Sequence, residues 1–260
     1  MRMTAVLFDL GGTLFGYERR EEMGRPSLAA LRRLGLDPDD PAVRDARRRA
    51  SEDVEREYAA RPSFLHRDLF RDRIARTAAL AGVTAPEEVL TRFDEEHLQA
   101  ILDHLVPRPD ARETLQGLRA RGLYTAVVSN ADDDYLDTLL ERHGLDVLLD
   151  DWTSSEEARS CKPDRRIFEH ALAKARRASG EAVFVGDSPQ HDVAGAQALG
   201  MYTVVIGEPG TAAPLSHGLE TPRGADADVR TLIEVLAIVD GLNGTGPAQD
   251  TEVGGTTWSH

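Results

Sequence analysis

Residues 4–13 read TAVLFDLGGT and set the architecture that we expect for the whole chain. The apolar run at residues 5–8 is short, as is typical of a strand buried inside a parallel sheet. Asp9 then lies at the carboxyl end of that strand, where a carboxylate can attack an electrophile or bind a metal ion. Gly11 and Gly12 let backbone groups approach an anion or a metal closely. The same pattern also describes an ordinary turn between a strand and a helix.

Strand and helix patterns alternate through the rest of the chain. Apolar runs of the same kind predict further strands at residues 124–128, 182–185 and 202–206. Helical apolar spacing, in several cases followed by glycine as a stop signal, predicts helices at residues 111–121, 134–142, 165–177, 192–199 and 231–239. This rhythm predicts an α/β fold with a doubly wound parallel sheet.

A long interval without strand patterns interrupts this rhythm. Residues 18–105 show amphipathic helical spacing with breaks at residues 35–41, 61–63 and 82–86, which predicts a bundle of about four helices. Its runs of mixed charge, at residues 44–49 and 52–57, are typical of solvated helix faces. We expect a core from residues 1–16 and 106–240, a helical insertion at 17–105, and a disordered tail at 241–260.

Composition narrows the class of protein. The 260 residues are 41% hydrophobic, which is enough for one large α/β domain with an insertion. The formal net charge of −14 disfavours a nucleic-acid or anionic-membrane partner. No apolar run reaches the length of a membrane span, and the single cysteine, Cys161, requires no oxidising compartment. We expect a cytoplasmic protein, and the oligomeric state stays open.

Polar residues gather where the predicted strands end, which is where open parallel sheets bind ligands. Ser129-Asn130 follows the second predicted strand and suits a phosphate oxygen, although a loop or helix cap is the ordinary alternative. Lys162 precedes a predicted helix and can neutralise a phosphate, although most lysines are surface residues. Asp187 follows the third predicted strand with Asp192 nearby, and such hard oxygen ligands suit Mg²⁺.

These four segments, in this order, resemble the motifs of the haloacid dehalogenase superfamily over about residues 4–239. The resemblance implies a Rossmann-like core with an inserted helical cap of the C1 type. It implies that Asp9 is the nucleophile that forms an aspartyl-phosphate, with Lys162 assisting. It also implies a Mg²⁺ site and a site for the phosphoryl group. The metal would be held by Asp9, the Gly11 carbonyl and Asp187, with Asp192 at or near it, and the phosphoryl group by Gly12, Thr13, Ser129, Asn130 and Lys162.

Gly11 departs from the family pattern. Phosphatases of this superfamily usually carry a second aspartate there, which protonates the leaving oxygen. Glycine has no side chain to transfer a proton, and losing a general acid or base typically costs on the order of 10²- to 10⁴-fold in rate. Candidate replacements, each also readable as an ordinary structural or surface residue, are Tyr17, Glu18, His66, His104 and His191.

Three functions remain open from the residues. The first is a Mg²⁺-dependent phosphatase for a small phosphorylated metabolite, slowed or specialised by Gly11. The second is a metal-independent 2-haloacid dehalogenase, because halide leaves without protonation, although Asp187 then lacks a purpose. The third is a protein that binds a phosphorylated ligand and turns it over slowly.

Overall fold

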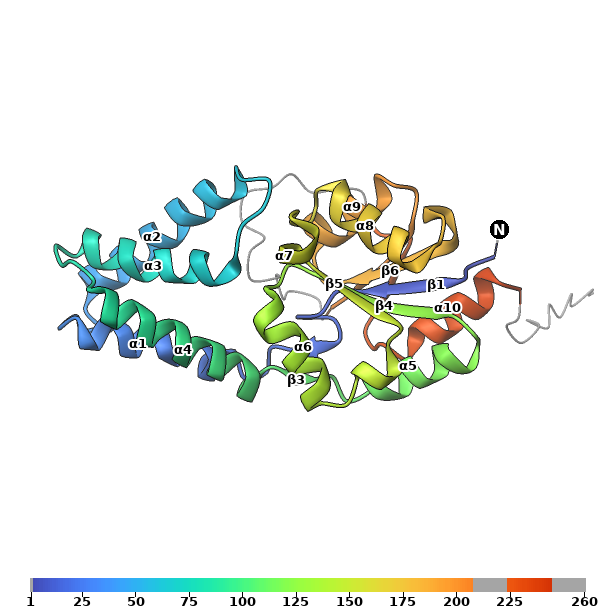
Figure 1. The fold of residues 1–260 in the computed structure, drawn as a ribbon, viewed down its shortest axis with the longest axis horizontal. Helices are drawn as coiled ribbons and strands as arrows, with labels where there is room; N and C mark the ends of the chain where they lie inside the picture. The colour runs from blue at the N-terminus through green and yellow to red at the C-terminus, as the bar shows by residue number, and fades with distance from the viewer. Residues whose placement is uncertain (1, 208–223, 245–260) are drawn as a thin grey trace, which may run out of the picture.

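The central sheet fixes the architecture of the protein. The structure, a computed structural model, describes residues 2–207 and 224–244. A six-stranded parallel sheet runs in the order β5-β4-β1-β6-β7-β8 (Figure 1). The strands are β1 (Ala5–Phe8), β4 (Tyr124–Ser129), β5 (Asp151–Ser154), β6 (Ala182–Gly186), β7 (Tyr202–Ile206) and β8 (Ala227–Val229). Four of these match the predicted apolar runs, and β1 lies between β4 and β6.

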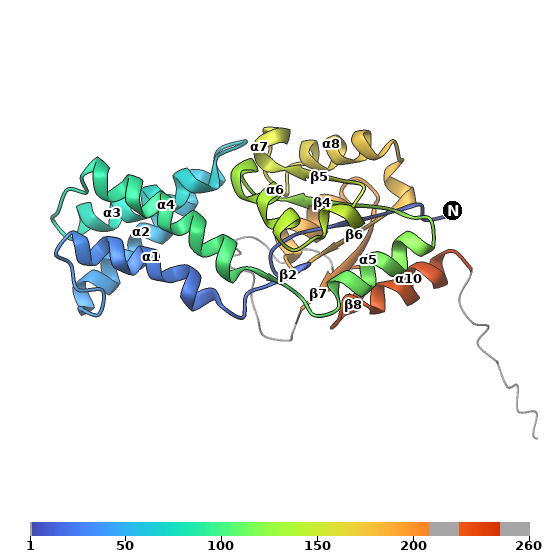
Figure 2. The same cartoon turned by 60° about the horizontal axis from the view of Figure 1, so that its bottom comes forward.

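Alternate side chains of β1 supply cores on opposite faces of the sheet. Val6 and Phe8 belong to a cluster that includes helices α5, α6 and α10, whereas Ala5 and Leu7 belong to a cluster that includes α8 and α9. These helices are α5 (Ala111–Ala120), α6 (Asp133–Arg142), α8 (Arg165–Ala175), α9 (Ala194–Gln197) and α10 (Glu234–Leu242). Helices cover both faces of the sheet (Figures 1 and 2), which confirms the predicted doubly wound fold.

The remaining long helices form a lobe beside the sheet (Figure 1). They are α1 (Arg20–Arg33), α2 (Pro41–Ala59), α3 (His66–Leu80) and α4 (Glu87–His104), separated at the three predicted breaks. Helix α1 packs against α4, and α2 packs against α3. The chain enters and leaves this lobe through β2 (Phe15–Gly16) and β3 (Val106–Pro107), which pair in antiparallel orientation.

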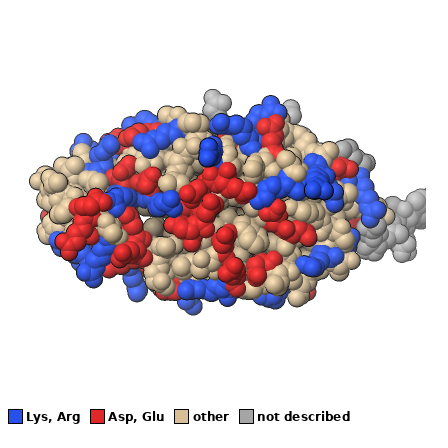
Figure 3. Space-filling model, viewed as in Figure 1, with Lys and Arg blue, Asp and Glu red and all other residues tan. Residues whose placement is uncertain are grey.

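The surface of the helical lobe carries interspersed charges of both signs (Figure 3). Arg48, for example, pairs along α2 with Asp45 at 2.6 Å and with Glu52 at 2.8 Å. Such i,i+3 and i,i+4 pairs stabilise a solvated helix face. Arg48 is exposed, as the prediction of solvated faces expects, although it also lines the cavity described below.

Several short elements escaped the sequence patterns. Strand β5 is mostly polar, β8 has three residues with Asp228 at its centre, and β2 and β3 have two residues each, so none forms an apolar run. The predicted helix at residues 192–199 is wrong in detail, because a π-helical turn, Pro189–Val193, precedes the short α9. The wide turn is fixed by Pro189 at its start and by the Ser188 amide, which donates to Asp192 Oδ2 at 2.9 Å.

The last helix, α10, begins and ends three residues later than predicted. Gly241 and Leu242, the first residues of the expected tail, therefore belong to α10. Residues 245–260 of that tail and residues 208–223 of the Gly/Pro-rich loop lie outside the described residues. Within the described ranges, no helix has both the length and the apolar character needed to cross a bilayer. The cytoplasmic location stays a prediction.

Candidate active site

The predicted site residues meet at the carboxyl ends of the three central strands. Asp9 follows β1, Ser129 ends β4, and Asp187 follows β6. Because β4, β1 and β6 are adjacent and parallel, their carboxyl ends share one edge of the sheet. Lys162 joins them from the loop before α8. All four residues line one cavity.

A buried ion network links three of these segments. Lys162 Nζ lies 2.5 Å from Asp9 Oδ1 and 2.6 Å from Asp192 Oδ1. The exposed fractions are 4% for Lys162, 7% for Asp9 and 1% for Asp192. Burial opposes the charge of Lys162, but the two carboxylates outweigh it and raise the pKa of the ammonium group above its usual value. The lysine is therefore cationic, and it balances part of the negative charge of the site.

Gly12 brings the backbone close to the third carboxylate. Its φ is +84°, in the left-handed region that favours glycine. A Cβ atom at this position would lie 2.1 Å from Asp187 Oδ2, well inside contact distance. Glycine is thus required at residue 12 both by conformation and by space. The close approach of the chain to Asp187 therefore explains the second glycine of the Gly-Gly pair.

The carboxylates of Asp9, Asp187 and Asp192 form a cluster suited to a divalent cation. One oxygen from each lies within 4.8 Å of the others. Burial, then the charges of Asp9 and Asp192, raise the pKa of Asp187 to about 8. Burial also raises the pKa of Asp9 to about 6 against the opposing effect of Lys162. Three carboxylates share one ammonium group, so a cation with a preference for oxygen ligands, such as Mg²⁺, fits the residues present.

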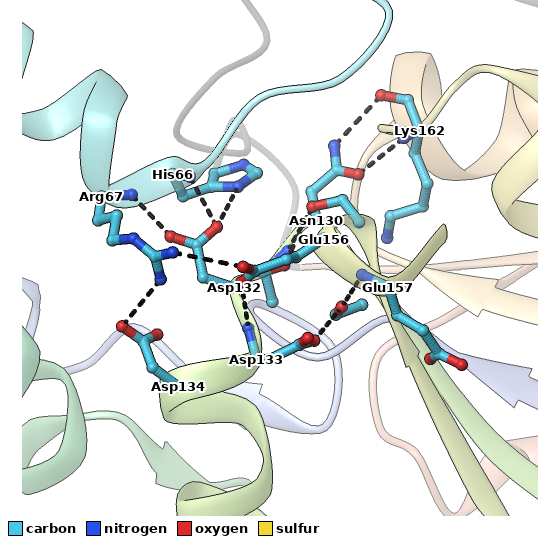
Figure 4. A network of polar contacts seen from close by, with 12 residues as sticks. His66, Arg67, Asn130, Asp132, Asp133, Asp134, Glu156, Glu157 and Lys162 are labelled. Carbon is cyan, nitrogen blue, oxygen red and sulfur yellow. Dashed lines mark hydrogen bonds and ion pairs between the residues drawn. The ribbon is translucent and has the colours of Figure 1, made fainter. Parts of the chain in front are cut away.

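Thr13 and Asn130 form hydrogen bonds with members of this network. Thr13 Oγ1 donates to Asp9 Oδ2 at 3.4 Å. The Asn130 side chain holds the backbone of Lys162 on both sides (Figure 4): Oδ1 accepts from Lys162 N at 2.7 Å and Nδ2 donates to Lys162 O at 3.2 Å. Asn130 therefore positions Lys162. The predicted contacts of Asn130, Ser129, Gly12 and Thr13 with a phosphoryl group stay predictions.

The cavity has a volume of about 1270 Å³ and is shared between the sheet and the helical lobe. Arg20, Arg44 and Arg47 contribute to its wall from α1 and α2. Arg48 lines the cavity as well, and the sequence interpretation of residues 44–49 as a solvated face missed this second role of the three arginines of α2. Nothing in the charge pattern separates a guanidinium that lines a cavity from one that faces bulk solvent, since both lie on the polar side of one helix.

The candidate replacements for the missing proton donor separate into two groups. Tyr17, His66 and His191 line the cavity, whereas Glu18 and His104 do not. His191 Nδ1 lies 3.1 Å from Ser188 Oγ, and burial lowers its pKa. Tyr17 lines the cavity together with Asp9 and Gly11.

Asp132 is a structural residue of the site region that the sequence did not single out (Figure 4). It is 1% exposed and lies in the loop between β4 and α6. Its carboxylate accepts from the backbone amides of His66 at 2.7 Å and of Arg67 at 2.8 Å, at the start of α3. The His66 ring lies 3.6 Å from the same carboxylate. Asp132 therefore links the sheet to the helical lobe by satisfying the free N–H groups of a helix 65 residues away in sequence.

Comparisons with known proteins agree with this geometry. The model of the haloacid dehalogenase-like hydrolase family matches residues 3–200. A ribulose-1,5-bisphosphate 5-phosphatase from Halopiger xanaduensis is 31% identical over 239 residues, which cover 91% of this chain and 99% of the relative. The (S)-2-haloacid dehalogenase 4A of Burkholderia cepacia is 34% identical over 128 residues, which cover 47% of this chain and 55% of the relative.

A solved structure extends the likeness to three dimensions. The crystal structure of a HAD phosphatase from Thermococcus onnurineus matches with a TM-score of 0.67 and 26% identity, covering 93% of this chain and 100% of that chain. The match of the family model over residues 3–200 includes all four segments that carry the site. Sequence, fold and site thus point the same way, and the chain belongs to the haloacid dehalogenase-like hydrolases.

Proposed function

We propose that this hydrolase is a Mg²⁺-dependent phosphatase for a small phosphorylated metabolite, with Asp9 as the nucleophile. The observation that carries the proposal is the buried pair of Asp9 and Lys162, 2.5 Å apart, with Asp187 and Asp192 beside it at the wall of a large cavity. The phosphatase name of the Halopiger relative, which spans nearly the whole chain, supports the same substrate class. The arginines in the cavity wall favour an anionic substrate.

The reaction would pass through a phosphorylated Asp9. A carboxylate oxygen of Asp9 forms a bond to phosphorus while the bond from phosphorus to the leaving oxygen breaks, and its electron pair departs with that oxygen. Water then attacks the phosphorus, the bond to Asp9 breaks with its electrons returning to the carboxylate, and the proton of the water passes to solvent. With a pKa of about 6, Asp9 is ionised at neutral pH and able to attack.

Lys162 and a metal ion bound at the acidic cluster would both contribute electrostatic stabilisation. The Lys162 ammonium lies against Asp9 and reduces the repulsion between that carboxylate and an approaching phosphoryl group. Bound Mg²⁺, held by Asp9, the Gly11 carbonyl and Asp187 with Asp192 nearby, would supply Lewis-acid stabilisation of the phosphoryl oxygens. The helical lobe, residues 17–105, would act as a cap over the core formed by residues 1–16 and 106–240.

Activity measurements test this proposal directly. We expect phosphate release from a panel of small phosphate esters that requires Mg²⁺, stops with EDTA, and is lost in Asp9→Asn. Because residue 11 has no acid, we expect aryl and acyl phosphates to react faster than simple alkyl phosphates. Absence of Mg²⁺-dependent release across the panel at high enzyme concentration contradicts the proposal.

Metal-independent dehalogenation is a second candidate, favoured by Gly11 and by the partial likeness to the Burkholderia dehalogenase. A halide leaves without protonation, so the missing acid costs nothing in that reaction. Chloride release from short 2-chloro acids that EDTA does not affect would establish it in place of the phosphatase. Mass spectrometry after mixing with acetyl phosphate tests the third candidate, a protein that binds a phosphorylated ligand with little turnover. A lasting adduct on Asp9 indicates chemistry that stalls, rapid turnover indicates a true phosphatase, and no adduct indicates binding only.

A further inference from the structure

The Tyr17 hydroxyl occupies the space beside Gly11. A Cβ atom built on Gly11 would lie 2.3 Å from Tyr17 Oη and 3.0 Å from Cζ. Unlike Gly12, Gly11 does not have a positive φ, so its backbone conformation is open to other residues. With Tyr17 in this position, space and not conformation favours glycine at residue 11. The phenol of Tyr17 thus fills the space that a side chain at residue 11 would need.

The phenol is held among the groups of the candidate site. Tyr17 lines the cavity with Asp9, Gly11 and Asp187, and its ring packs against the main hydrophobic core. Within residues 2–207 and 224–244, no hydrogen bond of its hydroxyl is found, so the donor is available to a ligand. An ordinary tyrosine is protonated at neutral pH, and burial together with the charges of Asp9 and Asp187 raises the pKa of Tyr17 further.

We propose that Tyr17 Oη donates a hydrogen bond to the leaving oxygen of the substrate, from the space that a side chain at residue 11 would otherwise fill. This role rests on the proposed phosphatase function. Tyr17 keeps its proton throughout: the hydroxyl stabilises negative charge that develops on the leaving oxygen, and the departing group takes its proton from water. The contribution should therefore grow with the basicity of that oxygen, because a more basic leaving group gains more from a donor.

A purely structural Tyr17 makes a different prediction. If the phenol served only to pack beside Gly11, its loss would lower the rate for every substrate by the same factor. The dependence of the loss on the leaving group therefore separates the two roles.

The test compares Tyr17→Phe with the unmodified protein on 4-nitrophenyl phosphate, phenyl phosphate and glycerol phosphate, all with Mg²⁺. We expect kcat/KM to fall about 3-fold on the first and roughly 10²-fold on the last, which is the order found for a single oxyanion donor. Tyr202→Phe removes a hydroxyl from the start of β7 in the sheet and is the matched control. Equal losses on all three substrates, or no loss, overturn the role of Tyr17 while leaving the phosphatase proposal intact.

Failure of the phosphatase proposal itself would give a different result. If the unmodified protein releases no phosphate from any of the three esters, the phosphatase proposal falls and the role of Tyr17 falls with it. Activity in the unmodified protein combined with a flat response of Tyr17→Phe removes only the inference about Tyr17.

The placement of the hydroxyl has a test that needs no activity. Gly11→Ala puts a methyl group where Tyr17 Oη lies, so we expect it to lower Tm by several degrees. In a Tyr17→Leu background the space is free, and the same substitution should lower Tm by less than half as much. An equal loss of Tm in both backgrounds would show that the phenol lies elsewhere, and it would overturn the inference.

Discussion

The carboxylate of Asp9 and the ammonium group of Lys162 lie 2.5 Å apart with both side chains almost completely buried. Lys162 also contacts Asp192 at 2.6 Å, so one cation serves two carboxylates. A buried charge pair of this kind is costly to break, because the partner that remains is left unpaired away from water.

Removal of the lysine charge should damage both stability and activity. Lys162→Met should lower the free energy of unfolding by roughly 3–5 kcal/mol at neutral pH. Phosphate release should fall by about 10²-fold or more, since the phosphoryl group loses a cation. Urea unfolding in EDTA and initial rates with Mg²⁺ check the two effects. Lys174→Met is the control, because Lys174 pairs with Asp151 and Glu157 where all three side chains are a quarter or more exposed, and it should cost less than Lys162→Met. Similar losses in both variants would contradict the prediction.

The raised pKa of Asp187 should make the metal-free protein less stable as pH rises. The folded pKa of about 8 lies above the ordinary aspartate value of 3.8, so the folded state binds more protons than the unfolded state between these limits. Stability from this group is therefore lost as pH increases through that window. In EDTA, the Tm of Asp187→Asn should exceed that of the unmodified protein, by roughly 5 °C at the upper end of this pH window.

Mg²⁺ should act on the same group in the opposite direction. Added Mg²⁺ should raise the Tm of the unmodified protein most at high pH, where Asp187 is ionised, and should raise that of Asp187→Asn little. The exposed Asp228→Asn is the matched control and should respond as the unmodified protein does. An equal Mg²⁺ effect in all three proteins would place the cation outside the cluster.

Loss of the Asp132 carboxylate should weaken the attachment of α3. Asp132→Ala leaves two amides at the helix start without their partner, at an expected cost of about 1–3 kcal/mol. Burial acts to raise the pKa of Asp132, but hydrogen bonds from His66 and Arg67 outweigh it and lower the pKa. The stabilisation is thus present at neutral pH and lost as pH falls below the usual aspartate range.

Urea unfolding across this pH range checks the effect of Asp132. Asp134→Ala is the control, since that carboxylate pairs with Arg67 at 3.2 Å on the surface. A constant gap between Asp132→Ala and the unmodified protein down to acid pH would show that the carboxylate charge is not involved.

Restoration of an acid at residue 11 should succeed only when the phenol is removed. Gly11→Asp alone places its side chain on Tyr17 Oη, so it should lower stability without raising activity. Gly11→Asp combined with Tyr17→Ala frees the space, and hydrolysis of glycerol phosphate should rise by on the order of 10²-fold over Tyr17→Ala. Rates and Tm values for the three variants check this, and a full gain from Gly11→Asp alone would contradict the arrangement.

Local sequence patterns predicted the sheet and the cluster because both depend on short segments. The apolar run before Asp9 and the one before Asp187 identify buried strands, and parallel strands carry their terminal residues to one edge. The helices between residues 20 and 104 were also predicted, from the spacing of their apolar residues and from the breaks between them. Polar or very short strands, such as β5 and β2, left no such pattern.

Those local patterns could not predict contacts between distant segments. The capping of α3 by Asp132 joins a loop of the sheet to a helix far away in sequence, and an aspartate after a strand equally suits the start of its own next helix. Tyr17 was one candidate among five, and only the packing of its ring beside Gly11 distinguishes it. The acid missing from the motif was visible in sequence, whereas the group filling its space was not.

The pairing of β2 with β3 ties together the two places where the described chain passes between sheet and helices. Phe15 pairs with Pro107 and Gly16 with Val106, so the two connections are held side by side by one short antiparallel ladder. Tyr17 is the first residue after β2, and its ring packs against the main hydrophobic core. The phenol therefore lies at the junction between sheet and helices, where a movement of the helices relative to the sheet would change its distance from Asp9.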